Sequence, residues 1–412
     1  MTARARPSGY SRWNGARQGA AAVLALGVWA AGASAEPLTP VLPQTIQRGT
    51  PGLAIARGVD GARARRAELP APGEATVLWQ RRIPGGLSGD VLVDQDGNIF
   101  VAGHGRVVQL SADGRYEFTR RAEFSSAAAS ALLSDGQRAV LGRDGTLSAW
   151  SARGRSTFQL TLAVPPGWAR GDLLPLPEGS VLVSAGSWLL QISSRGELEA
   201  YAQLPAPVAE TLLDGDRAWI ISEAGDVFQW DGHSPPLQRG SFAGQVNAAS
   251  LQAPGQLIAL MNGNELAQWS LASGERSSLG KLDGLGAGAR TSLSTGALLR
   301  VLGAGGGLFS LALDAEQGSE SMPEAQRVPA GTGELLSSAT TVACFIANAP
   351  LLLRQHAAER ASSEVLCAQP LSLAPAGQQR FVAACRSGQL WLLGPATSEA
   401  AASQDEAGPA GG

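Results

Sequence analysis

The chain has 412 residues, a formal net charge of −3 and 44% hydrophobic residues, which is enough apolar material for a sizeable core. A pI near 5.8 argues against nucleic acid as a partner, because nucleic-acid binding needs a basic face. The 52 glycines and the 16% share of charged residues are typical of many short strands joined by tight turns.

The first 35 residues have the pattern of an export signal peptide. The stretch from Gly19 to Gly32 carries no charge, and Ala33-Ser34-Ala35 supplies the small residues of a cleavage site before Glu36. A basic region precedes both and contains Arg4, Arg6, Arg12 and Arg17. No cysteine for a lipid anchor lies near this site, and no later segment reaches the ~18 apolar residues of a membrane span. We therefore expect cleavage between Ala35 and Glu36 and an exported protein, periplasmic or extracellular, without a membrane span.

Two segments outside the repeats have the composition of connecting or disordered chain. Residues 36–73 are punctuated by prolines and keep no helix or strand period, so we expect a linker there. Residues 395–412 consist mostly of Ala, Gly, Ser, Glu and Asp, which predicts a disordered tail. The folded domain is expected to span residues 74–394.

Residues 74–394 repeat with a period of about forty residues. The first clear unit has an Asp96-Gly97 turn, an apolar strand, a glycine turn and a second strand that ends at Leu110. The turn between the second and third strands recurs in steps of 40, 41, 39, 38, 44, 41 and 40 residues, at Gly105, Gly145, Gly186, Gly225, Gly263, Gly307, Asn348 and Gly388. This period with strand-turn-strand content predicts an all-β β-propeller with four-stranded antiparallel blades.

The two ends of the repeat region predict how the ring closes. The last unit supplies three strands, Pro370–Pro375, Arg380–Arg386 and Gln389–Gly394, and has no fourth. An orphan strand, 76–81, precedes the first unit and can complete the last blade, which gives eight blades in all. Trp79 should then be buried against the strand 389–394. Three other tryptophans at nearly one repeat offset are expected to fill the wedges between blades: Trp150, Trp230 and Trp269.

The unit from Asp96 to Phe118 and the stretch from Glu74 to Trp79 resemble the PQQ-like repeats of quinoprotein-type propellers. The resemblance covers residues 74–394, although the units near 295–368 fit it poorly. Two kinds of protein carry such repeats: pyrroloquinoline-quinone alcohol and glucose dehydrogenases, and non-enzymatic scaffolds such as the propeller lipoprotein of the outer-membrane protein assembly machinery. The dehydrogenases are longer and usually carry vicinal cysteines near the cofactor. This chain has no Cys-Cys pair, so the resemblance favours the scaffolds.

The sequence shows no catalytic or metal-binding constellation. His104, His233 and His356 fall in separate units without HExxH or HxH spacing, and neither a GxSxG elbow nor a P-loop is present. Gly284 to Ala289 matches GxGxxA only by letters and is read as a loop. Asp94 to Asn98 begins like a calcium loop, but Gly105 stands where an EF-hand needs glutamate, so an Asp-Gly turn is expected. We assign no catalytic residue, no cofactor and no metal.

The three cysteines lie late in the chain. Cys344 and Cys385 fall on equivalent strands of neighbouring units, and Cys367 falls on the outer strand of the seventh. An exported protein can form disulfides, and an odd count leaves one thiol over. We expect a bridge between Cys367 and Cys385; the alternative is three buried free cysteines.

Function is therefore expected at the ends of the ring, in the turns between second and third strands and in the connections between blades. The candidate binding residues are His104, Arg143, Trp168, Arg170, Trp188, Glu223, Asn262 and Arg386. Trp and Arg are enriched at binding hot spots, although Trp168 packed over the rim is an equal alternative. The sequence favours a non-catalytic scaffold for a protein or peptide over a small quinoprotein oxidoreductase. A lyase or carbohydrate-binding propeller stays open as a third class.

Overall fold

The computed structural model describes residues 52–54, 67–162, 171–252, 255–283, 285, 292–294, 298–303, 305–312, 324–331, 333–338, 341–355 and 359–395. The predicted signal peptide with Ala35 and Glu36, most of the predicted linker, Trp168 and Arg170, and the tail after residue 395 lie outside this part. Every regular element in the described part is a β-strand.

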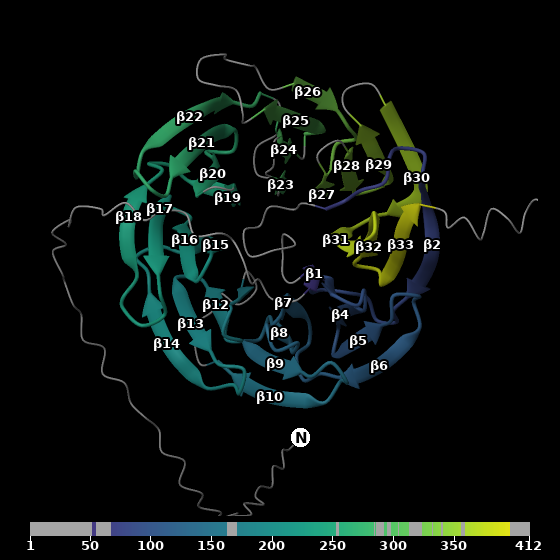
Figure 1. Cartoon of the computed structure of the whole chain (residues 1–412), viewed down its shortest axis with the longest axis horizontal. Coiled ribbons are helices and arrows are strands. Elements are labelled where there is room, and N and C mark those ends of the chain that lie inside the picture. The colour runs from purple at the N-terminus through teal and green to yellow at the C-terminus, as the bar shows by residue number, and fades with distance from the viewer. Residues whose placement is uncertain are drawn as a thin grey trace, which may run out of the picture. The chain divides into compact units, whose positions relative to one another are not determined.

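The strands form eight antiparallel sheets arranged as blades around one axis (Figure 1). The chain is therefore an eight-bladed β-propeller, as the repeat predicted. Blades 1 to 4 take their strands in chain order from the axis outward: β3 (Leu92–Asp94), β4 (Ile99–Gly103), β5 (Arg106–Leu110), β6 (Tyr116–Arg121); β7 (Ala127–Leu132), β8 (Arg138–Gly142), β9 (Thr146–Trp150), β10 (Ser156–Thr161); β11 (Asp172–Pro175), β12 (Val181–Ala185), β13 (Trp188–Ile192), β14 (Leu198–Gln203); β15 (Val208–Asp214), β16 (Arg217–Ser222), β17 (Asp226–Trp230), β18 (Leu237–Ser241).

Blades 5 to 7 continue the same arrangement, and blade 8 combines the two ends of the repeat region. Their strands are β19 (Val246–Gln252), β20 (Gln256–Met261), β21 (Glu265–Ser270), β22 (Arg276–Lys281); β23 (Ser292–Ser294), β24 (Leu298–Leu302), β25 (Gly307–Ala312), β26 (Glu324–Arg327); β27 (Gly333–Ser337), β28 (Thr341–Ile346), β29 (Ala349–Gln355), β30 (Glu359–Cys367); and β31 (Pro370–Gly377), β32 (Arg380–Cys385), β33 (Gln389–Pro395), β2 (Ala75–Arg82).

The position of a strand in its blade explains its composition. Strands in the middle of a blade are covered on both faces by the neighbouring blades, so they are mostly apolar; all five residues of β4 and of β8 are buried, Arg138 among them. The outer strand has one face in solvent. In β6 only Phe118 is buried, and the other five residues are exposed. Trp150, Trp230 and Trp269 are 4–5% exposed and lie in the clusters between blades, as expected.

The turns between second and third strands adopt the left-handed backbone that glycine favours. Gly105, Gly145 and Gly388 have φ values of 66°, 84° and 94°. One position was assigned wrongly from the sequence: Gly306, with φ 87°, makes the turn in blade 6, and Gly307 already begins β25. The run of glycines at 305–307 made the two indistinguishable by pattern.

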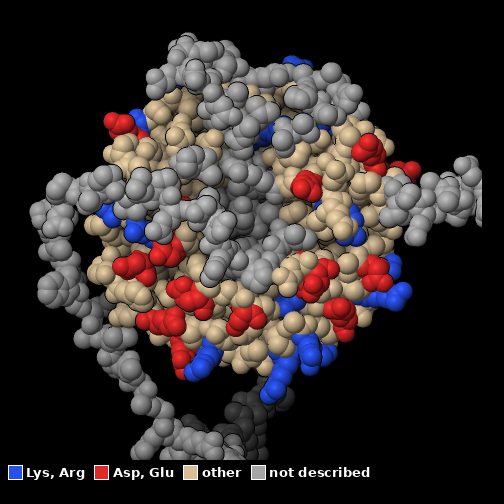
Figure 2. Space-filling view, viewed as in Figure 1, with Lys and Arg blue, Asp and Glu red and all other residues tan. Residues whose placement is uncertain are grey.

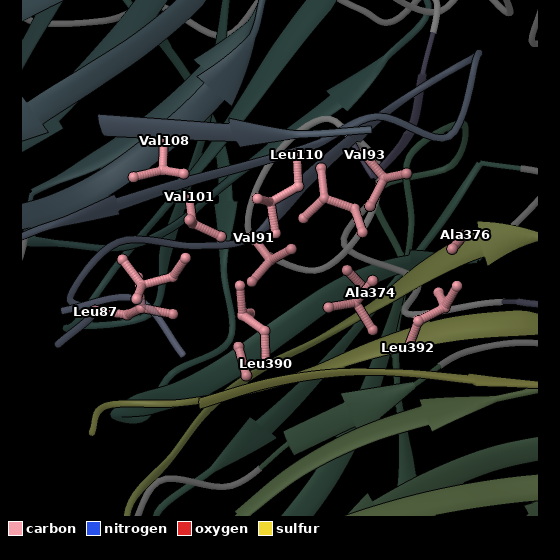
Figure 3. Packing of buried hydrophobic residues seen from close by; sticks show 14 of the residues in the cluster. Leu87, Val91, Val93, Val101, Val108, Leu110, Ala374, Ala376, Leu390 and Leu392 are labelled. Atoms are coloured by element: carbon pink, nitrogen blue, oxygen red, sulfur yellow. The ribbon is translucent and has the colours of Figure 1, made fainter. Parts of the chain in front are cut away.

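Strand β2 closes the ring, as predicted. It pairs antiparallel with β33, with Thr76 opposite Gly394, and the Thr76 hydroxyl donates to the Gly394 carbonyl at 3.3 Å. Behind this pairing, side chains of blades 1 and 8 form one apolar cluster (Figure 3). Val91 and Val93 from blade 1 meet Ala374, Leu390 and Leu392 from blade 8 in this cluster. The junction between the two chain ends is thus packed like any other blade junction.

Trp79 differs from its expected place. It is only half-buried, and its indole faces blade 1, where Nε1–H donates to the Ala112 carbonyl at 3.0 Å. A Cβ on Gly114 would lie 2.9 Å from Trp79 Cδ2, so only glycine fits beneath the ring. Outer-strand aromatics repeat this contact at the next two junctions: a Cβ on Gly154 would lie 2.6 Å from Phe118, and Gly196 lies against Phe158 in the same way. Trp79 thus joins blade 8 to blade 1.

The predicted linker contains structure that its sequence did not indicate. Gly52–Ala54 forms a short strand, β1, that pairs with β3 and adds a fifth strand on the axial side of blade 1. Farther on, the Ala67 amide donates to the Ser337 carbonyl at 2.8 Å, and Leu69 is 7% exposed in a cluster with Leu336. Prolines and glycines around these residues hide any strand period, which is why the pattern predicted only a linker.

Candidate functional site

The antiparallel blades give the ring two chemically different ends. One end, called here the connection end, carries the turns between second and third strands and the connections from blade to blade. The other, the hairpin end, carries the turns between first and second strands, which lie near the axis, and those between third and fourth strands, which lie near the rim (Figure 1).

The described candidates from the sequence all lie at the connection end but do not form one site. His104 and Arg386 come from adjacent blades and both lie beside Gly86; a Cβ there would be 2.7 Å from the Arg386 carbonyl oxygen and 3.7 Å from His104 Cδ2. His104 Nδ1 lies 3.2 Å from the Ser125 carbonyl oxygen. The remaining candidates are in separate blades, at Arg143, Trp188, Glu223 and Asn262.

Several of these candidates have local structural roles. The Glu223 amide donates to the Pro207 carbonyl at 2.7 Å, which extends the ladder between β15 and β16. Asn262 has φ 50°; its Oδ1 accepts from the Gln245 amide at 3.1 Å and its Nδ2 donates to Glu265 Oε2 at 2.9 Å. These contacts hold the local turn structure, and whether the six described candidates bind a partner stays a prediction.

The hairpin end carries a feature that the sequence reasoning missed. The inner turns of blades 1 to 4 each hold one or two carboxylates, here called the acidic arc: Asp96, Asp135, Glu178, Asp214 and Asp216. All are exposed except Asp214, which is half-buried. The corresponding turns of blades 5 to 8 contain no acidic residue (Ala-Pro-Gly, Thr-Gly-Ala, Ser-Ala-Thr and Gly-Gln-Gln). Figure 2 shows acidic side chains gathered over blades 2 to 4.

Turn geometry accounts for two of the carboxylates at these turns, Asp94 and Asp135. Asp94 Oδ1 accepts the backbone amides of Asp96 and Asn98 at 3.0 and 2.9 Å, and Asp135 Oδ1 accepts the Gln137 amide at 3.0 Å. Glycine follows with positive φ, 80° at Gly97. The Asp-Gly turns predicted from the repeat therefore also place negative charge around the mouth of the ring.

Within the described part of the chain, two basic side chains lie near the arc. The 3%-exposed Arg138 side chain spans two blades, and its Nη2 lies 2.8 Å from Asp94 Oδ2. Burial lowers the pKa of Arg138, and Asp94 and Glu117 oppose that shift. Arg217 contacts Asp216 only at 4.0 Å. The pKa of Asp214 is raised, chiefly by burial and also by the Asp216 charge, with Arg217 opposing. Among the described residues, Asp94 has a close basic partner in Arg138, and the exposed carboxylates of the arc have none closer than 4.0 Å.

The outer turns of the hairpin end contain arginines in blades 1 to 3. Exposed guanidinium groups stand there at Arg115, Arg153, Arg155 and Arg195. Arg115 is paired with Asp113 at 2.9 Å. Because Asp113 and Glu197 stand in the same turns as Arg115 and Arg195, only the outer turn of blade 2 among these three, with Arg153 and Arg155, carries a net positive charge. Such a pattern can orient a charged partner as well as attract it.

A disulfide joins blades 7 and 8. It links Cys367, at the end of β30, with Cys385, at the end of β32, and both residues are 2% exposed. Cys344 is a buried free thiol. Burial raises its pKa to about 12, although nearby Arg354 and Arg300 favour the thiolate. A thiol with such a pKa is inert toward nucleophilic chemistry at neutral pH.

Within the described residues, no group of three or more His, Cys, Asp or Glu side chains is placed to hold a metal ion. The same part of the chain has no helix that could cross a membrane. Polar side chains at both ends of the ring are suited to contact another molecule.

The fold defines the class of protein: an eight-bladed β-propeller closed by its own N-terminal strand. The sequence matches no protein-family profile and no curated protein. Among solved structures, the chain is similar to BamB from Moraxella catarrhalis, with 16% identity, a TM-score of 0.60 and coverage of 78% of this chain and 97% of BamB. It is also similar to Sqt1 from Saccharomyces cerevisiae, with 12% identity, a TM-score of 0.59 and coverage of 78% and 99%.

A third similar structure is a virginiamycin B lyase from Staphylococcus aureus, solved in a catalytically inactive form with quinupristin. It has 12% identity, a TM-score of 0.52 and coverage of 78% of this chain and 100% of the lyase. Identities this low establish the propeller fold and leave activity to be argued from the site.

Proposed function

We propose that this chain is a non-catalytic binding propeller that holds a protein or peptide partner outside the cytoplasm, and that its repeats belong to the PQQ-like kind. The acidic arc carries the proposal. Carboxylates at the inner turns of four consecutive blades, with none at the inner turns of the other four, form a one-sided surface of the kind that recognises basic segments of other proteins.

The export part of the proposal rests on two features. Residues 1–35 have the composition of a cleaved signal peptide. The disulfide between Cys367 and Cys385 fits an oxidising compartment, because cytoplasmic thiols are kept reduced. N-terminal sequencing of the mature protein should begin at Glu36. A mature chain that begins at Met1 would refute the cleavage.

The binding proposal is tested by crosslinking and capture from the exported fraction with the wild-type chain and two matched variants. The first variant neutralises the arc with Asp96→Asn, Asp135→Asn, Glu178→Gln and Asp216→Asn. The second neutralises four exposed rim charges with Arg115→Gln, Arg153→Gln, Arg155→Gln and Arg195→Gln. A partner that is captured by the wild type, lost with the arc variant and released by salt supports the proposal.

A partner that the arc variant retains at wild-type level would contradict this assignment. Dye-linked turnover of alcohols or aldose sugars by the purified chain, supplied with pyrroloquinoline quinone and calcium, would instead establish the oxidoreductase alternative. Both variants should melt like the wild type, since the substituted side chains are exposed and Asn at position 135 still caps its turn.

A further inference from the structure

At the connection end, the first residue of a third strand faces the last residue of the fourth strand. In blade 5 this pair is Glu265 and Lys281, whose side chains form an ion pair at 2.9 Å, and in blade 2 it is two threonines. In blade 1 it is Arg106 and Arg121. Among the described strands, blade 1 alone has two like charges at this position. Like charges directly opposite each other destabilise a sheet, so the pair calls for a compensating charge.

The described part of the chain does not supply that charge. Neither Arg106 nor Arg121 forms an ion pair with a described carboxylate. The acids nearest to them along the chain have other partners: Glu117 accepts from a glutamine within blade 1, and Glu123 Oε2 accepts from Gln159 Nε2 of blade 2 at 2.6 Å. Two adjacent guanidinium groups are therefore available to an anion from outside the chain.

Both arginines face the junction at which the ring closes. Val108, two residues after Arg106 on β5, packs in the cluster between blades 1 and 8. Alternate residues of a strand share a face, as do directly opposite residues of paired strands, so Arg106 and Arg121 also face blade 8. A Cβ on Gly85, in the connection from blade 8 to blade 1, would lie 4.0 Å from Arg106 Nε. The outer strands of the two blades, β2 and β6, follow one another around the rim (Figure 1).

Two of the candidates predicted from the sequence lie at the same junction. A Cβ on Gly86 would be 3.7 Å from His104 Cδ2 and 2.7 Å from the Arg386 carbonyl oxygen. Gly85 and Gly86 have φ values of 85° and 80°, and a Cβ on Gly85 would meet nothing but Arg106 within 4 Å, so the space beside that guanidinium group stays open. Four basic residues thus border a connection without side chains, here called the basic junction: His104, Arg106, Arg121 and Arg386.

The chemistry of these side chains selects the ligand. Guanidinium groups are planar donors that bind carboxylate and phosphate oxygens in pairs. Three of them and an imidazole exceed the charge of one carboxylate and suit a phosphate group, which has several acceptor oxygens and a charge near −2.

We propose that the basic junction is a binding site for a phosphate group, carried by a small soluble molecule or by a lipid headgroup. The site lies at the opposite end of the ring from the acidic arc and does not depend on the partner proposed there.

Calorimetric titration with inorganic pyrophosphate tests the site in the full-length chain. The first variant carries Arg106→Gln and Arg121→Gln, and a control that loses the same charge carries Arg153→Gln and Arg155→Gln in the outer turn of blade 2. The first variant should bind at least about tenfold more weakly than the wild type, because charge-assisted hydrogen bonds are lost. The control should stay within about twofold, and added salt should weaken binding to the wild type.

A further variant separates loss of the site from loss of the fold. Arg121→Glu gives blade 1 the opposite charges that blade 5 has at this position, so it should melt above the wild type and yet lose pyrophosphate binding. Pyrophosphate should raise the melting temperature of the wild type and leave that of Arg121→Glu unchanged. If Arg121→Glu melted below the wild type, the two arginines would not be an unfavourable pair, and the argument for a bound anion would fail.

Vesicles distinguish the two sources of phosphate. Retention of the wild type on phosphatidylcholine vesicles that contain phosphatidic acid, lost in the Arg106→Gln, Arg121→Gln variant, assigns a lipid headgroup. Pyrophosphate binding without such retention assigns a soluble phosphate compound.

Three results would overturn the proposal. They are no binding of the wild type to either probe, equal binding of the wild type and the Arg106→Gln, Arg121→Gln variant, and tighter binding of an oligoglutamate peptide than of pyrophosphate, which would make the ligand an acidic peptide. None of them alters the capture result expected for the acidic arc, so the two proposals fail separately.

Discussion

Replacing Trp79 tests the closure of the ring directly. Trp79 belongs to the closing strand β2, yet its indole contacts Gly114 and hydrogen bonds to Ala112 in blade 1. Trp79→Ala therefore removes the contacts of the closing strand with blade 1 and part of its packing against the apolar cluster between blades 1 and 8. Phe118 and Phe158 make the same contact between consecutive blades, and Trp79 differs from them because its strand also pairs with β33 from the other end of the repeat region.

The expected cost follows from partial burial. A fully buried aromatic side chain removes about 150–250 Å² from water, so a half-buried indole removes roughly 100 Å², equivalent to about 2.5 kcal/mol at ~25 cal/mol/Å². The lost hydrogen bond to Ala112 adds about 1 kcal/mol at most. Because the unfolded chain is itself partly compact, we expect the free energy of unfolding to fall by about 2–3 kcal/mol, below the ~3–5 kcal/mol of a fully buried ring.

Urea unfolding followed by circular dichroism measures this change, with Tyr201→Ala as the matched control. Tyr201 is an outer-strand aromatic on β14 and is 53% exposed, so its loss should cost about 0.5 kcal/mol or less. Gly114→Ala should also destabilise the chain, since φ is +78° and the new Cβ would meet the indole. Part of that cost should vanish in the double variant with Trp79→Ala. Equal midpoints for Trp79→Ala and Tyr201→Ala would refute this account of closure.

Three further substitutions test the disulfide, the buried ion pair and the half-buried carboxylate. Cys385→Ser breaks a bridge with a sequence separation of 18 and should cost about 3 kcal/mol; reductant should then destabilise the wild type and Cys344→Ala but not Cys385→Ser, as urea midpoints would show. Arg138→Ala removes the buried partner of a carboxylate and should lower the free energy of unfolding by about 3 kcal/mol, against near-neutral Arg153→Ala at the exposed rim. Asp214 has a raised pKa in the folded chain, so its ionisation opposes folding; Asp214→Asn should be more stable than the wild type at neutral pH, and urea titrations should show the gap closing as the pH falls toward 3.8. A gap that is constant with pH would contradict the sign of that shift.

The architecture could be predicted from the sequence because each blade has turn residues at the same positions, about forty residues apart. The turns at Gly105 and Gly388 and the missing fourth strand of the last unit were enough to assign the ring and its closure. Burial of individual side chains was harder to judge. Trp79 was expected to be fully buried, but an outer strand keeps one face in solvent, and its ring packs on a turn of the next blade.

The candidate site was missed for a physical reason. Asp96 and Asp135 were explained completely by turn formation, so their charges were not considered further, and only the assembled ring brings the turns of four blades to one mouth. Strand β1 carries no alternation that could identify it, because an added strand at an axial edge is selected by main-chain pairing. The chosen candidates at the connection end share a repeat position, but the ring spaces them around its circumference.

The closing strand also imposes an order on folding. Strand β2 is synthesised early, but its partner β33 comes more than three hundred residues later, as the 318-residue separation between Thr76 and Gly394 shows. Bringing such distant segments together costs roughly 5 kcal/mol of loop-closure entropy, which must be met before the last pairing forms. Neighbouring blades can form as the chain emerges. The whole ring can fold as one cooperative unit only after β33 has been synthesised and can pair with β2. Until then β2 stays an unpaired edge, and an exposed edge of this kind is open to aggregation.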